Sequence, residues 1–445
     1  MTTIRGFFDR ESRQLFRNSS WVFIANFYST GLAFLRSILI ARGLGATLFG
    51  SYVLVVAFVG LIQEFLNLNL GTAIIRYGAV FQARQRKDQL FALVRSCLRW
   101  SLVMLAVSLA AVFVLSSVSY EHFFHTPGLE TYVLLYAVAA GLTYFNSVSR
   151  GLLRLHYRFR TTSVIEIIMD TLETVVVASV IWIYPRDLDS FFPAMIVVRF
   201  LNGAILNYMA FRELRHEWER DPNSVGDLLE EERQEIRKFV LGNSLGNTLK
   251  TMISQGDVLL LGLLTSAEQV AYYAVAKKLA YSVLTLTDPL VSSIYPQLSK
   301  LVAERKFTDV KLMIRKVTTF AAVPALLVFG VMYFINRWVV EAVYGPEFAP
   351  AAASFMFFLA GALLGAVTFW SLPLVQSLGL VKMRIVAYLV TIVLGVTLSL
   401  LLLPVFQAEG MAIALMLTNF LNATIFIRFA YRTIRQIERS GPAES

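Results

Sequence analysis

Long apolar runs separated by short polar turns fill almost the whole chain. Each run has about 20 residues, the length that an α-helix needs to cross the hydrocarbon core of a bilayer. The pattern predicts an all-α integral membrane protein with about 12 transmembrane helices. The predicted spans are 18–41, 48–70, 98–119, 131–149, 162–184, 191–211, 239–263, 271–297, 317–336, 350–374, 385–403 and 409–427.

The composition agrees with a membrane protein. Apolar residues make up 57% of the 445 residues and charged residues only 16%, against roughly 25% charged in an ordinary soluble protein. The first apolar run has full length rather than the short core of a signal peptide, so we expect the first helix to be retained. The single cysteine, Cys97, excludes an internal disulfide and a cysteine-rich metal cluster.

Lysine and arginine residues are concentrated in alternate loops. Of the 40, 32 lie at the two ends of the chain or in 76–99, 150–160, 212–238, 300–316 and 382–384, whereas the opposite loops contain Arg42, Arg186 and Arg337. Positive residues accumulate in cytoplasmic loops, so we predict two cytoplasmic termini and a multi-pass protein of the inner (cytoplasmic) membrane. The net charge of +10 lies beside these spans, so lipid rather than nucleic acid is the expected partner.

The longest predicted cytoplasmic loop falls near the middle of the chain and separates six spans from six. We therefore expect two six-helix bundles joined by a linker. The predicted segments are a cytoplasmic or interfacial N-terminal segment (1–17), an N-terminal bundle (18–211), a linker loop (212–238), a C-terminal bundle (239–427) and a cytoplasmic tail (428–445).

The two halves show a weak internal similarity. Each begins with a long span, a short outer turn and a second span that contains a tyrosine. An even number of spans in each half makes the repeat parallel, and the substrate is then expected to bind between the bundles. An offset of 221 residues pairs Asn26 with Asn247, Leu39 with Leu260, Ala46 with Ala267, Tyr52 with Tyr273, and Arg36 with Asp257.

Eleven ionisable side chains fall inside the predicted spans. Placing such a group at bilayer depth costs at least about 2.5–3.5 kcal/mol, so each should face a polar cavity or a partner. Three of the acids recur at i, i+4 and i+7 in the fifth span and form one stripe that cannot face lipid. We interpret the polar interior as a transport pathway. The bases are Arg36, Arg199, Lys250, Lys277 and Lys278, and the acids are Glu64, Glu166, Asp170, Glu173, Asp257 and Asp288.

The five bases have alternative interpretations. Arg36 is close to the outer end of its span, so its guanidinium either extends to the membrane surface or faces the cavity. Arg199 and Lys250 are nearer mid-depth, where a cavity role is favoured. Lys277 and Lys278 point about 100° apart on a helix, so one of the two is expected to face the cavity, and the sequence does not say which.

The acids also have alternatives. Glu166 lies near the cytoplasmic mouth and is either a cavity residue or a solvated residue at a helix end. Asp170 and Glu173 are deeper, where the alternative is a structural ion pair with Arg199 or Lys250. Asp288 precedes a proline, which predicts either a break that lines a cavity or a simple kink.

Several segments carry a resemblance to a known family. The first is FLRSILIARGLGATLFGSYVLV near the start, and the second is SQGDVLLLGLLTSAEQVAYYAVAKKL after the central loop. PLVSSIYPQLSKL, YGPEFAPAAASFMFFLAG and LGLVKMR follow in the expected order. The whole chain thereby resembles the polysaccharide transporter branch of the multidrug/oligosaccharidyl-lipid/polysaccharide flippase superfamily, typified by Wzx-like O-antigen flippases.

The resemblance implies a flippase without enzymatic activity. It would move a polyprenyl-diphosphate-linked oligosaccharide to the outer leaflet by alternating access, driven by H⁺ or Na⁺ and without a cofactor. Glycosyltransferases and a glycan polymerase are the implied partners, and the chain is expected to act as a monomer.

We assign site roles on the chemistry that such a cargo requires. Fixed cations would bind the diphosphate or acidic sugars, amide and phenol groups would contact hydroxyls or else pack between helices, and acids would bind the coupling ion or form ion pairs. The cations are Arg36, Arg199, Lys250, Lys277 and Lys278; the polar groups are Asn26, Asn247 and Tyr273; and the acids are Asp170, Glu173, Asp257, Glu64, Glu166 and Asp288.

Two rival functions remain open. A multidrug or lipid II transporter of the same superfamily is one, although multidrug relatives favour acidic and aromatic cavities and lipid II relatives usually have two more spans. The other is a membrane enzyme such as a glycan polymerase or ligase, for which the outer loops are short. His122 and His125 are spaced as a metal pair, but without a third ligand they are more often interfacial polar residues.

Overall fold

The computed structural model describes residues 10–123, 129–218, 229–282, 284 and 288–439. Within these ranges it describes all side chains except those of 10–19, 117–123, 216–218, 243, 245–255, 288–292 and 381. Every regular element in the described ranges is helical, which confirms the all-α class. The chain forms two compact units, Met1–Leu259 and Leu260–Ser445.

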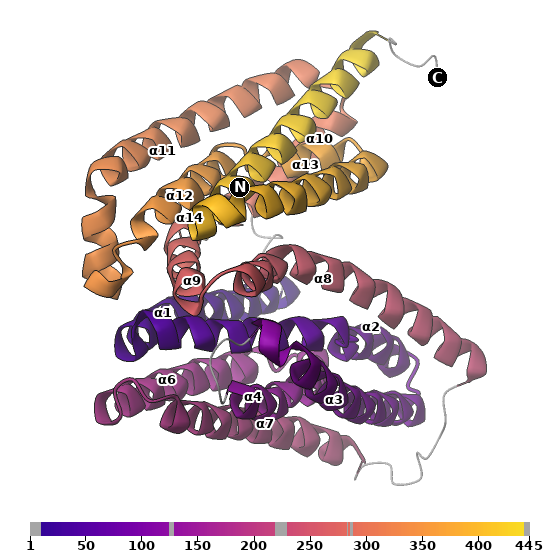
Figure 1. Cartoon of the computed structure of the whole chain (residues 1–445). Coiled ribbons are helices and arrows are strands. Elements are labelled where there is room, and N and C mark those ends of the chain that lie inside the picture. The colour runs from indigo at the N-terminus through magenta and orange to yellow at the C-terminus, as the bar shows by residue number, and fades with distance from the viewer. Residues whose placement is uncertain (1–9, 124–128, 219–228, 283, 285–287, 440–445) are drawn as a thin grey trace. The chain divides into compact units, whose positions relative to one another are not determined.

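The first unit contains α1 to α8. Helices α1 and α6 lie side by side, and α6 packs in turn against α7 (Figure 1). Helices α2 and α5 pack closely on each other. The helices are α1 (Arg10–Phe65), α2 (Leu70–Ala83), α3 (Lys87–Phe123), α4 (Leu129–Gly141), α5 (Thr143–Leu155), α6 (Phe159–Ile183), α7 (Leu188–Trp218) and α8 (Glu230–Leu264), of which the last five residues lie in the second unit.

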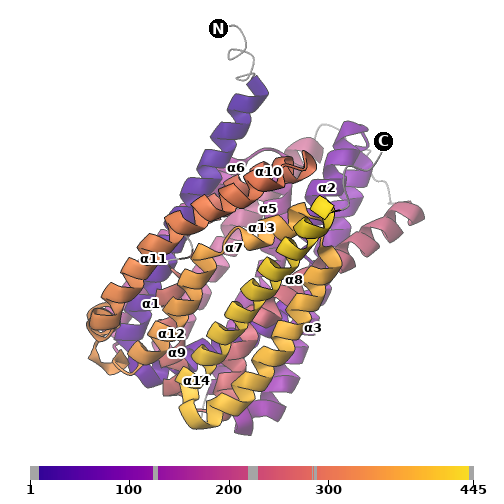
Figure 2. The ribbon, with the colours of Figure 1, turned by 90° about the horizontal axis from the view of Figure 1, so that it is seen from above.

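The second unit contains the remaining helices. Helix α12 contacts α9, α11 and α14 (Figure 2). A separate core forms where α10, α13 and the ends of α11 and α14 meet, around the buried side chains of Leu298, Trp370 and Leu374. The elements are α9 (Ala267–Tyr281), α10 (Asp288–Ala303), α11 (Phe307–Tyr344), the short 3₁₀ helix η3 (Pro346–Phe348), α12 (Ala351–Val367), α13 (Ser371–Ser377) and α14 (Val381–Arg439).

Six helical stretches in the described chain are long and apolar enough to cross a membrane, or seven if the bent pair α12 and α13 forms one span. The longest two have 64 and 58 residues, more than twice what one crossing needs. They bend where Gly45 and Gln407 leave the helical conformation. Helix α6 is not in this set and carries three acids. The structure confirms a multi-pass protein, and the count of twelve spans and the position of the termini stay predictions.

The first helix breaks of the two halves occur at equivalent positions. Gly45 interrupts α1 with φ 76° and ψ 174°, and Ser266, 221 residues later, separates α8 from α9 with φ −78° and ψ 161°. The positive φ at Gly45 is a conformation that side chains disfavour, so glycine suits this turn. The offset that aligned the two sequences therefore also aligns the two breaks.

Large apolar side chains cover the outside of both units. Trp182 is 89% exposed and Phe334 is 85% exposed, on α6 and α11. Contiguous exposed apolar surface of this kind is unfavourable in water and is the normal surface of a protein that lipid tails surround. The exposed residues thus support the prediction of a bilayer as solvent.

The turn before α7 is fixed by one carboxylate. Asp187 accepts hydrogen bonds from the Ser190 hydroxyl at 2.6 Å and from the backbone N–H groups of Asp189 and Ser190 at 2.9 and 3.3 Å. These bonds, the Ser190 hydroxyl first, hold the pKa of Asp187 below its ordinary value. The contacts are those of a helix N-cap and define where α7 begins.

Candidate functional site

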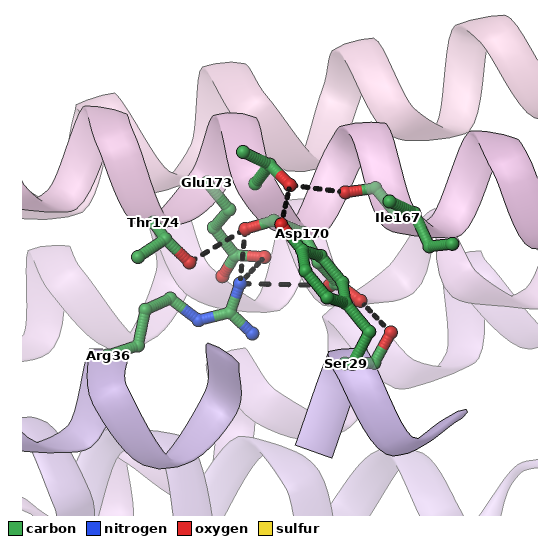
Figure 3. Close-up of polar contacts among 8 residues, drawn as sticks. Ser29, Arg36, Ile167, Asp170, Glu173 and Thr174 are labelled. Atoms are coloured by element: carbon green, nitrogen blue, oxygen red, sulfur yellow. Dashed lines mark hydrogen bonds and ion pairs between the residues drawn. The ribbon is translucent and has the colours of Figure 1, made fainter. Parts of the chain in front are cut away.

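A half-buried ion-pair cluster joins α1 to α6 in the first unit. Nη1 of Arg36 lies 3.1 Å from Oε2 of Glu173 and 3.7 Å from Oδ1 of Asp170 (Figure 3). The side chains of Arg36, Glu173 and Asp170 are 15%, 14% and 23% exposed. One guanidinium therefore faces two carboxylates inside an apolar helix bundle.

Local helix geometry places these groups together. Asp170 and Glu173 are three residues apart on α6, so their side chains share one face of the helix. Nη1 of Arg36 also donates to the Asp170 backbone carbonyl at 3.3 Å, which accepts a second bond from the Thr174 hydroxyl at 2.7 Å. The Ser29 hydroxyl, two turns before Arg36 on α1, donates to the Asp170 carboxylate (Figure 3). Asp170 is thus held by both helices.

A second arginine lies near Glu173. The guanidinium carbon of Arg199, on α7, lies 4.8 Å from the centre of the Tyr136 ring. Glu173 and Tyr52 are within electrostatic range of Arg199, and the Tyr52 ring meets the Phe191 ring edge-on at 5.4 Å. We call the set Arg36, Asp170, Glu173 and Arg199 the charged cluster. Its formal charges cancel.

The charged cluster contains a pairing that the sequence did not predict. Asp170 and Glu173 were expected to pair with Arg199 or Lys250 if their role were structural, and their direct partner among the described side chains is Arg36. A guanidinium already neutralised by carboxylates attracts an anion weakly.

Two other predicted acids of the first unit, Glu166 and Glu64, lie closer to helix ends. Glu166 Oε1 is 3.5 Å from Nε of Arg150 on α5, and Glu64 accepts a hydrogen bond from the Asn67 side chain at 3.3 Å. The side chain of Asn26 is exposed on α1. These three sequence-predicted residues therefore have surroundings different from those of the charged cluster.

The predicted site residues after the linker are dispersed. Tyr273 is fully buried, with its ring 5.0 Å from that of Phe358. Nζ of Lys277 lies 5.7 Å from the Tyr273 ring centre, whereas Lys278 is exposed. Asp257 is buried and accepts the Val258 N–H at 2.8 Å. Asn247 and Lys250 fall on α8 and Asp288 begins α10, but their side chains lie outside the described part.

A polar pocket of about 340 Å³ lies between α2 and α5 in the same unit as the charged cluster. Amide, hydroxyl and guanidinium groups surround it, and the described lining contains no carboxylate. The residues that define the polar pocket are Asn67, Asn69, Gly71, Thr72, Ile75, Thr143, Asn146, Ser147, Arg150, Gly151 and Arg154.

A helix break and a close helix crossing build the polar pocket. Asn69, between α1 and α2, has φ 46°, and its N–H donates to the Asn67 side chain at 3.0 Å. A Cβ at Gly71 would lie 2.3 Å from the Ser147 carbonyl oxygen, and one at Gly151 would lie 2.6 Å from the Gly71 oxygen. Glycine at both positions lets the two helices approach this closely.

Sequence reasoning missed the polar pocket. Arg150 and Arg154 were counted among the positive residues of a cytoplasmic loop, and Asn67 and Asn69 were not predicted as site residues. The available signal was the pair of arginines at i and i+4, which share one helix face, together with the NLNLG segment between two apolar runs. Such interruptions of a span are typical of transporter binding sites.

A profile of the family described as "Polysaccharide biosynthesis protein" matches residues 15–302, well over half of the chain. The chain belongs to this family. This confirms the resemblance drawn from the sequence at the level of a polysaccharide flippase-type family. None of the curated proteins matches.

Solved transporters share the fold of this polysaccharide biosynthesis protein. An inward-facing multidrug resistance MATE family transporter of the MOP superfamily aligns with a TM-score of 0.65 and 15% identity, over 93% of this chain and 96% of that one. The lipid II flippase MurJ, in an inward closed conformation, aligns with a TM-score of 0.65 and 11% identity. The alignment covers 95% of this chain and 93% of that one. A mutant of the Vibrio cholerae MATE transporter VcmN aligns with a TM-score of 0.54 and 14% identity over 97% of both chains. At these identities the likeness shows the fold. Family and fold together identify a membrane flippase or transporter.

Proposed function

We propose that this family member is a flippase for a polyprenyl-diphosphate-linked oligosaccharide in surface polysaccharide biosynthesis, such as that of O-antigen. It would carry the cargo from the cytoplasmic to the outer leaflet. The observation that carries the proposal is the charged cluster, because a polysaccharide biosynthesis protein that keeps two acids and an arginine mutually paired in an apolar bundle maintains a polar interior in the membrane.

The polar pocket suits the head group of this cargo. Arg154 supplies a cationic donor for phosphate oxygens beside Arg150, which also pairs with Glu166 at 3.5 Å, and guanidinium groups bind phosphate in two-point geometry. Asn67, Asn69 and Asn146 supply donors and acceptors for sugar hydroxyls. The lipid tail remains in the bilayer, so the protein needs such groups and no nucleophile.

The charged cluster supports coupling to H⁺ or Na⁺. When Asp170 and Glu173 are ionised, their negative charge neutralises Arg36 and repels an anionic cargo. Binding of a proton or a sodium ion to one carboxylate weakens the ion pair and exposes the guanidinium charge. Cargo affinity then depends on the ion, which is the thermodynamic link that a coupled transporter needs.

The other elements of the proposal follow the predicted organisation. The two bundles alternate access to the two sides of the inner membrane, with Lys250, Lys277 and Asp257 as further cavity groups from the second half. The protein works as an antiporter if the ion moves against the cargo. Glycosyltransferases that assemble the cargo and a polymerase that consumes it are the expected functional partners.

A second candidate rests on the structural comparisons. Solved proteins named as a multidrug resistance transporter and as a lipid II flippase align over more than 90% of this chain. Transport of a cationic drug would favour an acidic pocket, whereas the polar pocket has two arginines and no carboxylate among its described lining. The lining therefore favours an anionic cargo such as a lipid diphosphate.

Reconstitution tests transport against enzymatic conversion. The purified protein is placed in liposomes with a fluorescent lipid-linked oligosaccharide, and the lipid is recovered for mass analysis after transport. The proposal predicts that the lipid changes leaflet and keeps its mass. A new covalent product would overturn it in favour of a polymerase or ligase.

A further inference from the structure

A second groove of the first unit lies between α3 and α8 and shares no lining residue with the charged cluster or the polar pocket. Its volume is about 830 Å³. Four arginines line one part of it, two from each helix, and the described lining contains no acid. We call it the basic groove and define it by Arg95, Arg99, Trp100, Arg233, Arg237 and Leu241.

The arginines come from one turn of each of the two helices. Arg95 and Arg99 are one turn apart on α3, and Arg233 and Arg237 are one turn apart on α8, so each pair projects from one helix face. The side chains of Arg95, Arg99 and Arg237 are exposed, and that of Arg233 is half-buried. Because guanidinium groups remain charged at any physiological pH, the groove is a fixed positive site.

Three acids near the start of α8 contact residues other than Arg99 and Arg237. On α8, Glu235 accepts a hydrogen bond from the Tyr77 hydroxyl at 3.1 Å, and Glu232 pairs with Arg86 at 3.4 Å. Arg233 pairs with Glu230 at 3.2 Å. No ion pair joins Arg99 or Arg237 to an acid within the described part of the chain. The groove therefore keeps at least two uncompensated cations.

The next turn along both helices is apolar. Beyond Arg99, α3 presents Trp100, Val103 and Met104 to the groove, and beyond Arg237, α8 presents Val240 and Leu241. Trp100 is 39% exposed and Leu241 is 61% exposed, so apolar surface remains open beside the cations. A helix turn with arginines followed by an apolar turn matches the layout of a lipid with an anionic head group and acyl chains. Indole rings prefer this interfacial depth.

We infer that the basic groove binds an anionic phospholipid of the surrounding membrane. The phosphodiester contacts the arginines, and an acyl chain lies against Trp100 and Leu241. The positive residues of both helix ends place the groove on the predicted cytoplasmic side, where such lipid is available. Bound lipid would hold the start of α8 against α3, adding to the apolar contacts of Ile236 and Val240 with the core of the first unit.

Quenching of tryptophan by brominated lipid tests the inference. The whole protein is placed in nanodiscs with brominated phosphatidylglycerol or brominated phosphatidylcholine at equal mole fraction, and the Trp100 signal is the difference between wild type and Trp100→Phe. We expect phosphatidylglycerol to quench Trp100 more strongly. Two arginines each contribute about 1 kcal/mol near a membrane surface, so Arg99→Gln/Arg237→Gln should reduce this preference about tenfold or more.

A matched pair separates the groove from general surface charge. Arg84→Gln/Arg212→Gln removes the same charge from two exposed positions of the same unit that do not line the groove, and it should keep the preference. Arg99→Lys/Arg237→Lys should keep most of it, because lysine retains the positive charge. Equal quenching by both lipids, an equal loss in the matched pair, or displacement by an equimolar polyprenyl diphosphate would overturn the inference. Transport is not measured, so the outcome is independent of the proposed function.

Discussion

Arg36 and Glu173 form an ion pair of 3.1 Å between α1 and α6, with both side chains about 15% exposed or less. The pair connects residues that are far apart in the sequence and belongs to helices that pack along much of their length (Figure 1). Asp170 competes for the same guanidinium. The arrangement makes three charged groups mutually dependent in a medium where an unpaired charge is costly.

This dependence predicts a non-additive effect on stability. Arg36→Gln leaves the carboxylates of Asp170 and Glu173 without their ion-pair partner, which should lower the free energy of unfolding by about 3–5 kcal/mol. Adding Glu173→Gln removes one of the repelling charges, so the double variant should be more stable than Arg36→Gln alone. Thermal unfolding in detergent measures both.

An exposed ion pair supplies the control for that cycle. Arg337 and Glu341 lie one turn apart on α11 at 2.7 Å, with the arginine 77% exposed. Their removal, singly or together, should change stability by less than about 1 kcal/mol. If the Arg36 and Glu173 substitutions instead prove additive, the two side chains are not coupled as the structure indicates.

Asp170 is the most direct test of ion coupling. Its carboxylate is held by Arg36 and Ser29, and Asp170→Asn removes the site that would bind H⁺ or Na⁺ while keeping the shape. Transport by the variant should no longer respond to an imposed gradient. Asp309→Asn, at an exposed position near the start of α11, should respond as wild type does. An unchanged response in Asp170→Asn would exclude this carboxylate as the coupling group.

The polar pocket predicts a change in cargo affinity. Arg154 is exposed at the last turn of α5 and lines the pocket, and a hydrogen bond to a charged group contributes about 1.5–3 kcal/mol. Arg154→Gln should therefore raise the KM for transport by about tenfold or more at an unchanged maximal rate. Arg84→Gln, at an exposed helix end outside the pocket, should leave KM unchanged. Equal KM values in the two variants would exclude Arg154 from the head-group site.

The crossing of α2 and α5 predicts a steric effect. Gly71→Ala would place a Cβ 2.3 Å from the Ser147 carbonyl oxygen, a backbone atom that cannot move without shifting α5. We expect this variant to lose more than about 1 kcal/mol of stability, as overpacking typically does. Gly60→Ala on α1 meets no atom within 4 Å and should be neutral or slightly stabilising. A neutral Gly71→Ala would show that the helices do not pack this closely.

The apolar pattern predicted the helices well because their lengths follow from the bilayer. The bend at Gly45 lies in the short outer turn expected between the first two spans, and the basic loops coincide with helix ends such as Arg84. The second predicted span ends at residue 70, one residue past Asn69, whose φ of 46° separates α1 from α2. Helix α2 itself was not predicted, because its 14 residues are too few to cross a bilayer.

The sequence predicted the acids of the charged cluster but not their partner. The i, i+4, i+7 stripe on α6 showed that Asp170 and Glu173 share a face and need a partner. Their partner is Arg36, and its identity depends on which helix packs against that face, which the spacing of residues within one helix does not contain. The polar pocket was not predicted for the same reason, because Asn67 and Arg154 line it together only through the packing of α2 on α5.

Leaflet exchange of the cargo tests the central claim most directly. A fluorescent polyprenyl-diphosphate-linked oligosaccharide is incorporated into liposomes, and a membrane-impermeant quencher reports the fraction that remains protected in the inner leaflet over time. Liposomes that contain the protein should lose this protection far faster than protein-free liposomes, and an imposed ion gradient should change the rate. Equal protection with and without the protein, under every gradient applied, would contradict the account.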